Sequence, residues 1–291
     1  MLSILIPTHN FNVEKLVGEL YSQANSCGID FEIIIGDDFS SEIVYDSSEF
    51  ISTNLVQLHR VETLVGRTEM RKQLSLKAKY NWMLYVDADM LPNEKKYVHN
   101  YLIEIKKNPD KKIFFGGYSY PKKYSNKDRL RFRYGTKREF ISALKREINP
   151  YRNVYSGNML IHRETFKLIN ISLENSYGLD LAFSGQLEFH KIPFKHIDNY
   201  TCHMGIDDNN GFLLKSKEAS ITIRNLYDLE LINSKQSKLV WAYDLIKKLH
   251  LIKIVKLKGR LLSPLIFWML INFRVPLITL DFYKFYHFCK K

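Results

Sequence analysis

The sequence contains few cysteines, and their positions exclude two classes of small domain. Cys27, Cys202 and Cys289 are the three cysteines in 291 residues. They lie far apart and form no Cys-x-x-Cys pair, which argues against a disulfide framework and against a zinc knuckle. We therefore expect reduced thiols and a cytoplasmic protein.

Two further signals are missing. The apolar run at the amino terminus has no basic segment before it and is cut short by Pro7, so we expect a strand there and no signal peptide. No glycine-rich phosphate loop is present, which argues against a nucleotidyltransferase. With 45% hydrophobic residues, a chain of this length can still bury a large core.

Three apolar runs in the first ninety residues each stop at a polar cluster. The runs and the clusters that follow them are Leu2 to Ile6 before Pro7-Thr8-His9-Asn10, Phe31 to Ile35 before Gly36-Asp37-Asp38-Phe39-Ser40, and Trp82 to Val86 before Asp87-Ala88-Asp89. Carboxylates at such a position hold a hard divalent cation well, although solvated acids in a loop are the simpler alternative.

Helical patterns separate these runs. Apolar residues between 13 and 24, and again between Arg67 and Lys79, recur with the spacing of a one-sided helix. Alternation of strands and helices predicts an α/β fold with a mostly parallel sheet and right-handed crossovers. All three polar clusters would then lie at the carboxyl edge of the sheet, where such sheets bind ligands.

These motifs resemble those of the family 2 glycosyltransferases, inverting enzymes of GT-A fold that use nucleotide sugars. The resemblance covers roughly residues 1–225. Its further motifs are Arg71, Tyr155-Ser156-Gly157-Asn158, Tyr177-Gly178-Leu179-Asp180 and Thr201-Cys202-His203-Met204-Gly205. It implies a Rossmann-like sheet flanked by helices, with a catalytic domain over residues 1–225 that divides into a nucleotide-binding half (1–115) and an acceptor-binding half (116–225).

The resemblance also implies a cation that bridges the diphosphate of the donor. Asp89 is expected to bind it directly, Asp87 to contact the ribose or reach the metal through water, and His203 to be a further ligand. Oxygen and imidazole ligands without thiolates favour Mn²⁺ or Mg²⁺ over Zn²⁺. A hydrogen-bonded structural histidine is the alternative role of His203.

The remaining residues of the donor site are expected to bind the nucleotide and the sugar. Asp38 would accept a hydrogen bond from the base, which is uracil or another pyrimidine, while Asp37 orients its loop. Arg67 and Arg71 lie on one helical face and could reach the base or the diphosphate, or form a solvated basic face. The other contributors to the donor site are Pro7, Thr8, His9, Asn10, Ala88 and Asn158.

An inverting reaction needs a general base on the acceptor side, and Asp180 is the candidate. Many relatives have Glu-Asp at this position, whereas this sequence has Leu179 before Asp180. Glu174 and Glu188 are alternatives close in sequence. Between them and the donor half, residues 117–152 mix tyrosines with lysines and arginines, which predicts acceptor contacts or an exposed basic helix pair.

The last part of the chain is basic and aromatic. Residues 238–291 contain eleven Lys or Arg and two Asp, and the apolar stretch from Leu261 to Leu280 is interrupted by Pro264, Asn272, Arg274 and Pro276. We expect residues 226–291 to form a helical region that lies on an anionic cytoplasmic membrane surface without crossing it. Packing on the catalytic domain and a homodimer interface are the alternatives.

The leading hypothesis is therefore a metal-dependent glycosyltransferase. It would transfer sugar from a nucleotide-sugar donor, with a UDP-sugar favoured, to a hydroxyl of a surface polysaccharide or lipid-linked glycan, and nucleic acid is not expected as a partner. The alternative is a non-catalytic basic protein that binds RNA or membranes on a sheet of the same fold.

Overall fold

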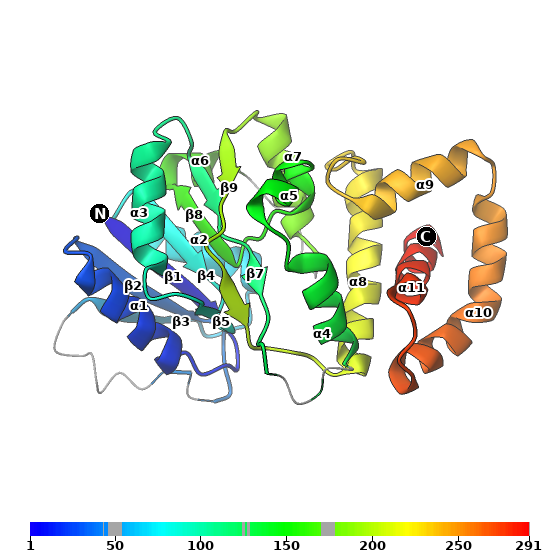
Figure 1. Ribbon diagram of the computed structural model, residues 1–291, viewed down its shortest axis with the longest axis horizontal. Helices are drawn as coiled ribbons and strands as arrows, with labels where there is room; N and C mark the ends of the chain where they lie inside the picture. Colours follow the sequence, from blue (N-terminus) through cyan, green and yellow to red (C-terminus); the bar gives the residue numbers. More distant parts are fainter. Residues whose placement is uncertain (43, 46–53, 124–125, 127–128, 170–177, 291) are drawn as a thin grey trace.

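A seven-stranded sheet forms the centre of the computed structural model (Figure 1), in the order β3-β2-β1-β4-β8-β6-β9. The structure describes residues 1–290 except 43, 46–53, 124–125, 127–128 and 170–177. The strands of this sheet are β1 (Leu2–Thr8), β2 (Phe31–Asp37), β3 (Val56–Arg60), β4 (Trp82–Val86), β6 (Ile113–Phe115), β8 (Asn158–His162) and β9 (Phe194–His196).

The part of the sheet nearest the amino terminus is parallel. β1 pairs in parallel with β2 and β4, and β2 pairs in parallel with β3. β8 is antiparallel to both β4 and β6, so the sheet as a whole is mixed. Three short strands form a second sheet in the order β5-β10-β7, with β5 at Met90–Pro92, β7 at Tyr118–Ser119 and β10 at Thr201–His203.

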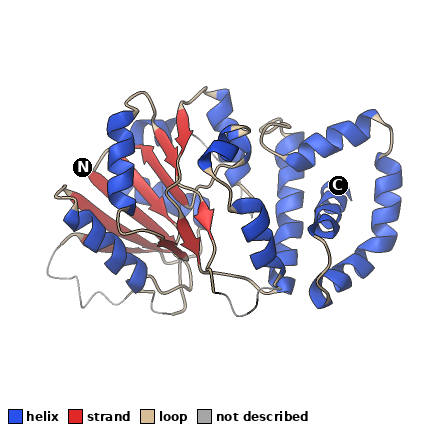
Figure 2. Ribbon diagram, in the orientation of Figure 1, coloured by secondary structure: helices blue, strands red, loops and turns tan. Residues whose placement is uncertain are grey.

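Helices cover both faces of the large sheet and continue beyond it (Figure 2). They are α1 (Glu14–Ser26), α2 (Arg67–Lys77), α3 (Tyr97–Lys107), α4 (Leu130–Tyr134), α5 (Ala143–Glu147), α6 (Arg163–Leu168), α7 (Asp180–Phe189), α8 (Asn209–Asp228), α9 (Lys238–Lys248), α10 (Ile252–Asn272) and α11 (Leu277–Lys290). A π-helical turn at Gly135–Glu139 follows α4, and a 3-10 turn occupies Pro150–Arg152.

Alternation along β1 divides the core into two layers. Ile4 and Ile6 point to one face, where they join a cluster with α1 and α3, while Leu5 points to the opposite face and joins α2 and α7. Because both faces are covered, the central strands are mostly apolar. Ser3 of β1 and Glu32 of β2 are buried exceptions, and the Ser3 hydroxyl donates to the Glu32 carboxylate at 2.6 Å. The α/β fold predicted from the sequence, with a mostly parallel sheet flanked by helices, is confirmed.

Helices α8 to α11 form a layer beside the sheet domain, at the right of Figure 1. Buried residues of α11, such as Leu280 and Phe288, pack in two apolar clusters with residues of α8 and α9. The predicted domain boundary at residue 225 falls inside α8, near its end. Among the described residues, no helix is both long enough and apolar enough to cross a membrane.

Candidate active site

The carboxyl ends of β1, β2 and β4 open into a cavity of about 650 Å³. This size is typical of a site for a small ligand or cofactor. The cavity brings together eleven of the thirteen residues predicted for the site. They are Pro7, Thr8, His9, Asp38, Arg67, Arg71, Asp87, Ala88, Asp89, Asp180 and His203.

The two acids at the carboxyl end of β2, Asp37 and Asp38, both accept hydrogen bonds from nearby backbone amides. Asp37 accepts a hydrogen bond from the Ser40 amide at 3.0 Å, in keeping with the predicted role of orienting its loop. Asp38 accepts from the amides of Val65 and Gly66 at 2.7 and 2.8 Å, and so fixes the turn that begins α2. Each carboxylate oxygen has a second lone pair, so Asp38 can still accept a hydrogen bond from a ligand in the cavity.

Asn10 is not among the residues that line the cavity, which differs from the prediction. Its side-chain oxygen accepts from the backbone amide and the hydroxyl of Ser41, and its backbone N–H donates to the Ser40 hydroxyl. Asn10 adopts a positive φ of 50°, as short polar residues do most readily. We correct its role to bracing the β1 and β2 loops against each other.

Asp87 is held between two arginines of α2. The guanidinium of Arg71 donates to it at 2.7 Å, and Arg67 donates to its other oxygen. Burial alone would raise the pKa of Asp87, but the two arginines outweigh it and lower that pKa below its ordinary value. Both oxygens of Asp87 therefore face arginines. Its predicted contact with the ribose, or with the metal through water, stays a prediction.

Arg71 also connects Asp87 to residues on the opposite side of the cavity. Its second terminal nitrogen donates to the Ser156 hydroxyl at 2.7 Å and lies 3.6 Å from a carboxylate oxygen of Asp180. Ser156 in turn donates to Asp180. Asp180 is the first residue of α7, and its side chain is 40% exposed. Arg71 and Ser156 orient its carboxylate, and its exposed part lines the cavity.

Asp89 and His203 approach each other from different strands. The distance between Asp89 Oδ2 and His203 Nε2 is 3.7 Å. Burial raises the pKa of Asp89, and burial lowers the pKa of His203 although Asp89 opposes that effect. The His203 ring stacks on Tyr120 at 5.8 Å, and its Nδ1 is buried with no hydrogen-bond partner among the described residues.

Two glycines make room for these acids. A Cβ on Gly157 would lie 2.1 Å from an Asp87 carboxylate oxygen, and one on Gly205 would lie 2.2 Å from Asp89 Oδ2. Both distances are far below van der Waals contact, so each acid occupies space that any other residue would fill. The sequence gives only a weak signal for these two glycines as site residues. Both lie within motifs in which other residues were the candidates for binding and catalysis.

Asn158 is not among the residues that line the cavity, so the structure gives no support to its predicted contact with the donor sugar. Its side chain is fully buried below the cavity. Its oxygen accepts from the hydroxyls of Tyr97 and Tyr101 at 2.7 and 2.6 Å, and its nitrogen donates to the carbonyls of Gly117 and Asn199. All four hydrogen bonds of the amide are used within the protein, so Asn158 joins α3 to the loops beneath the site.

Most described side chains of residues 117–152 support the fold. Arg131 is the member that lines the cavity, and its guanidinium donates to Glu139 at 2.8 Å. Burial would raise the pKa of Glu139, but Arg131 outweighs it and the pKa lies below its usual range. Tyr120, which stacks on His203, also donates to Glu139. Tyr124 and Lys127 lie outside the described residues.

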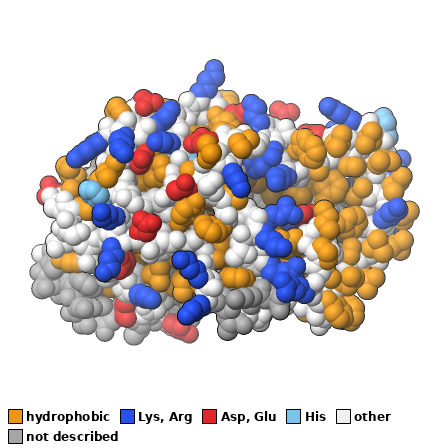
Figure 3. All heavy atoms as spheres, in the orientation of Figure 1, with side chains coloured by type: hydrophobic (Ala, Val, Ile, Leu, Met, Phe, Trp, Pro, Cys, Tyr) orange, Lys and Arg blue, Asp and Glu red, His pale blue; other side chains and the backbone are white. Residues whose placement is uncertain are grey.

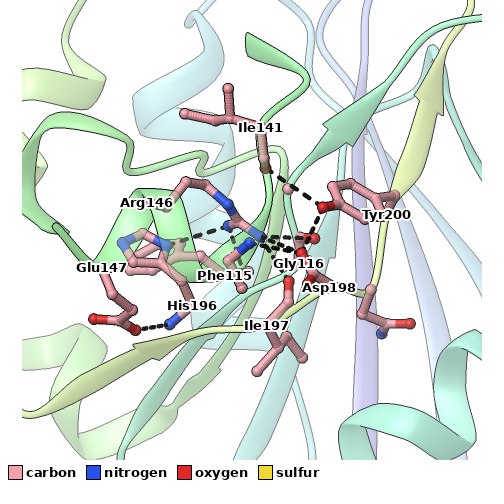
Figure 4. Close-up of polar contacts among 12 residues, drawn as sticks. Phe115, Gly116, Ile141, Arg146, Glu147, His196, Ile197, Asp198 and Tyr200 are labelled. Atoms are coloured by element: carbon pink, nitrogen blue, oxygen red, sulfur yellow. Dashed lines mark hydrogen bonds and ion pairs between the residues drawn. The ribbon is translucent and has the colours of Figure 1, made fainter. Parts of the chain in front are cut away.

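Arg146 is the most deeply buried cation of this segment (Figure 4). Its guanidinium donates to the carbonyls of Phe115 and Ile197 at 3.0 and 2.7 Å and lies 3.2 Å from His196 Nδ1. Figure 4 shows it in the middle of these groups, so it fastens β6 to the loop after β9. The expected acceptor contacts are therefore reduced to Arg131.

Three cavity residues on or beside α8 had no sequence prediction. They are Asp207, Lys215 and Glu218. Lys215 and Asp207 form an ion pair at 2.7 Å. Of the alternatives to Asp180, Glu188 binds Lys235 and Gln236 away from the cavity, and Glu174 lies outside the described residues.

The sequence model described as Glycosyl transferase family 2 matches residues 3–169, which is more than half of the chain. The chain belongs to glycosyl transferase family 2. Its enzyme class is therefore glycosyltransferase, as the sequence motifs predicted. A comparison with curated protein sequences gives no match.

Solved structures of low identity share the fold. The chain is similar to TarS 1-349 of S. aureus in complex with UDP-GlcNAc, with a TM-score of 0.54, 15% identity, and coverage of 99% of this chain and 90% of that chain. It is similar to the mannosyltransferase PcManGT of Pyrobaculum calidifontis in complex with GDP-Man and Mn²⁺, with a TM-score of 0.54 and 12% identity, over 75% of this chain and 61% of that chain.

A third structure with this fold is glucosyl-3-phosphoglycerate synthase of Mycobacterium tuberculosis in complex with Mn²⁺, UDP-glucose and phosphoglyceric acid. Its TM-score is 0.52 and its identity 12%, over 78% of this chain and 79% of that chain. These likenesses establish the fold.

Proposed function

We propose that this family 2 enzyme transfers a sugar, with inversion, from a nucleotide-sugar donor to a hydroxyl group. A UDP-sugar is the favoured donor, and a surface polysaccharide or lipid-linked glycan is the acceptor class. One observation carries the proposal: Asp89 and His203 meet in the same cavity as Asp180, which Arg71 and Ser156 hold from the opposite side.

The Asp89 and His203 side chains fit a divalent cation. Two ligand atoms that are each about 2.1 Å from one ion lie at most about 4.2 Å apart, and the 3.7 Å between Asp89 Oδ2 and His203 Nε2 satisfies this limit. Burial keeps His203 neutral, which is the form that binds metal. Mn²⁺ or Mg²⁺ bound there would neutralise the diphosphate as it leaves.

No group of three metal-binding side chains occurs among the described residues. The protein would therefore supply two ligands, and the donor and water the rest, as is common where a cation is shared with phosphates. Arg67 and Arg71 hold Asp87 in its charged form beside this position, which supports a contact of Asp87 with the ribose.

Asp180 is suited to accept the proton of the acceptor hydroxyl. It faces the cavity from the first turn of α7, and the Ser156 hydroxyl fixes one of its oxygens. The other oxygen is then available to the acceptor, so the proton moves from the hydroxyl to Asp180 as the bond to the anomeric carbon forms. Pro7, Thr8, His9 and Asp38 border the end of the cavity that we assign to the base.

The described site argues against a catalytically silent sheet. A protein that only bound RNA or membranes would not need an aspartate and a histidine that are both partly withdrawn from solvent and lie 3.7 Å apart in one cavity. The proposal keeps the cytoplasmic location that was expected from the sequence.

The variant Asp180→Asn tests the assignment of the base. We expect the affinity for UDP in the presence of Mn²⁺ to stay within about twofold, while transfer or slow hydrolysis of a UDP-sugar falls by about 10² to 10⁴. Isothermal titration and a donor-hydrolysis assay measure the two quantities. Asp110→Asn is the matched control, since Asp110 is exposed and far from the cavity.

Full activity of Asp180→Asn would refute the role of Asp180. Failure of the unmodified protein to hydrolyse any of a panel of nucleotide sugars, together with tight salt-sensitive RNA binding, would favour the non-catalytic alternative.

A further inference from the structure

The outer surface of α9 and α10 is apolar and exposed. It consists of Trp241, Leu245, Leu249, Ile254, Leu257, Leu261, Leu265 and Trp268, which we call the α9–α10 surface. Leu261 is 71% exposed and Trp268 is 52% exposed, which is unusual for such large side chains. Figure 3 shows hydrophobic side chains gathered over the C-terminal helices at the right of the molecule.

The exposed stripe on α10 lies opposite the face that packs on the protein. At about 100° per residue, Ile254, Leu261 and Leu265 fall on one side of the helix. Gly259 and Leu270 fall on the other side and are buried, and a Cβ on Gly259 would lie 2.0 Å from the Tyr286 ring of α11. α10 is therefore apolar on two faces, of which the protein covers only one.

Basic residues border the uncovered face. Residues 245–280 contain seven Lys or Arg and no Asp or Glu. Lys253 and Arg260 lie on one flank of the stripe and Lys258 on the other, and all three are exposed. The acids at either end, Asp244 and Asp281, accept hydrogen bonds from Tyr227 and Arg138.

An apolar stripe with basic flanks fits an anionic bilayer better than it fits a second copy of the chain. A second copy of the chain would place the same basic flanks against each other in a symmetric contact, without acids in the segment to oppose them. An anionic bilayer offers acyl chains for the apolar stripe and negative headgroups for the flanks. The ring of Trp268 lies 5.0 Å from that of Phe273 beside Arg274, and such aromatic pairs are typical at a headgroup boundary.

We propose that the α9–α10 surface docks the protein on a membrane rich in anionic lipids, with α10 lying in the plane of the interface. The helix does not cross the bilayer, since Pro264 and its basic first half exclude a spanning orientation. Docking would keep the enzyme at the membrane, which suits the lipid-linked acceptor of the proposed function. The docking itself does not depend on the proposed reaction.

The experiment is co-sedimentation of the full-length protein with vesicles of phosphatidylcholine, with and without 30–40% phosphatidylglycerol. We expect binding to the anionic vesicles that weakens with salt, and little binding to phosphatidylcholine alone. Leu261→Glu with Trp268→Glu should weaken binding at least tenfold. Lys253→Gln with Arg260→Gln should weaken it by roughly fivefold for each charge.

Matched controls separate the surface from general changes in polarity and charge. Leu76→Glu with Phe189→Glu introduces the same acids at positions that are 74% and 77% exposed but lie on α2 and α7. Lys106→Gln with Lys107→Gln removes two lysines of α3. Both controls should bind vesicles like the unmodified protein, and circular dichroism should show that every variant is folded.

Two results would overturn the proposal. The first is equal vesicle binding by the α9–α10 variants and the controls. The second is a concentration-dependent dimer in light scattering without lipid that Trp268→Glu dissociates, because the surface would then bind another copy. Nucleotide-sugar hydrolysis enters neither result, so failure of the docking proposal leaves the proposed function intact.

Discussion

At the scale of single residues, the site depends on small side chains next to charged ones. Asp87 and Asp89 come directly after β4, and the sequence was sufficient to mark them. What permits their positions is Gly157 and Gly205, which belong to distant segments and leave the space that the two carboxylates occupy.

Gly205→Ala should move Asp89 without removing it. The added Cβ would lie 2.2 Å from Asp89 Oδ2, so the carboxylate must turn away from His203. We expect the Mn²⁺-dependent affinity for UDP, measured by titration with and without EDTA, to fall at least tenfold. Gly18→Ala is the control, because nothing lies within 4 Å of its Cβ and alanine favours a helix.

A normal metal dependence of Gly205→Ala would argue that Asp89 is not a ligand. A large loss of thermal stability would instead show that the glycine serves the fold, and the Gly18→Ala value gives the baseline for that comparison.

Asn158→Asp tests the corrected role of Asn158. The change would place a carboxylate oxygen against the carbonyls of Gly117 and Asn199, where the amide nitrogen now donates. We expect the free energy of unfolding to fall by about 3 kcal/mol or more, measured with urea. Asn12→Asp should change it little, because Asn12 is exposed and uses its oxygen as an acceptor.

A stable Asn158→Asp protein with weakened donor binding would restore the original expectation that this residue contacts the sugar. The sequence could not separate the two roles, since the partners Tyr97, Tyr101 and Asn199 come from segments brought together only by the fold.

At the scale of elements, the local sequence pattern predicts the strands β1, β2 and β4 but not β3, β6 and β8. β1, β2 and β4 are apolar runs with helices between them, and they occur where the sequence predicted them. β3 alternates apolar and polar residues only over Val-Gln-Leu-His, and β6 is three residues long, so both patterns are short for a prediction. No strand is predicted at β8, whose partners β4 and β6 lie far away in the sequence.

One element-scale prediction concerns the cluster around Arg146. Burial and the neighbouring guanidinium lower the pKa of His196 to about 4, so the folded protein keeps this histidine neutral. The unfolded chain binds a proton near pH 6.5. Between pH 6.5 and 4 the free energy of unfolding should therefore fall as the pH falls, by up to about 3 kcal/mol from His196.

Urea unfolding at pH 4.5, 5.5 and 7 measures this slope in the unmodified protein and in His196→Gln. The variant is expected to be less stable at pH 7 but to have a shallower slope, with the remaining dependence due partly to His287, whose pKa is also lowered to about 4 by burial. An unchanged slope would show that His196 is protonated in the fold.

At the scale of the whole molecule, the C-terminal helices have an inner side that packs on the protein and an outer side that is exposed. α11 fills the space between α8, α9 and α10, and this packing agrees with the alternative that the sequence left open for the basic tail. The outer side of α9 and α10 keeps the apolar and basic character from which a membrane contact was expected. Composition alone could not divide these residues between an inner and an outer side, because α10 is apolar on both.

Deletion of residues 239–291 should therefore damage the catalytic domain as well as any membrane contact. The deletion would expose Ile223 and Leu226 of α8 in one cluster and Phe212 and Leu213 in the other, all buried in the full chain. Exposed apolar area of this size costs several kcal/mol at about 25 cal/mol per Å². We expect a lower unfolding temperature and aggregation in differential scanning calorimetry, whereas Leu261→Glu with Trp268→Glu should unfold near the temperature of the unmodified protein. An unchanged unfolding temperature after deletion would mean that α9 to α11 form an independent unit, because the core of the sheet domain would then be complete without them.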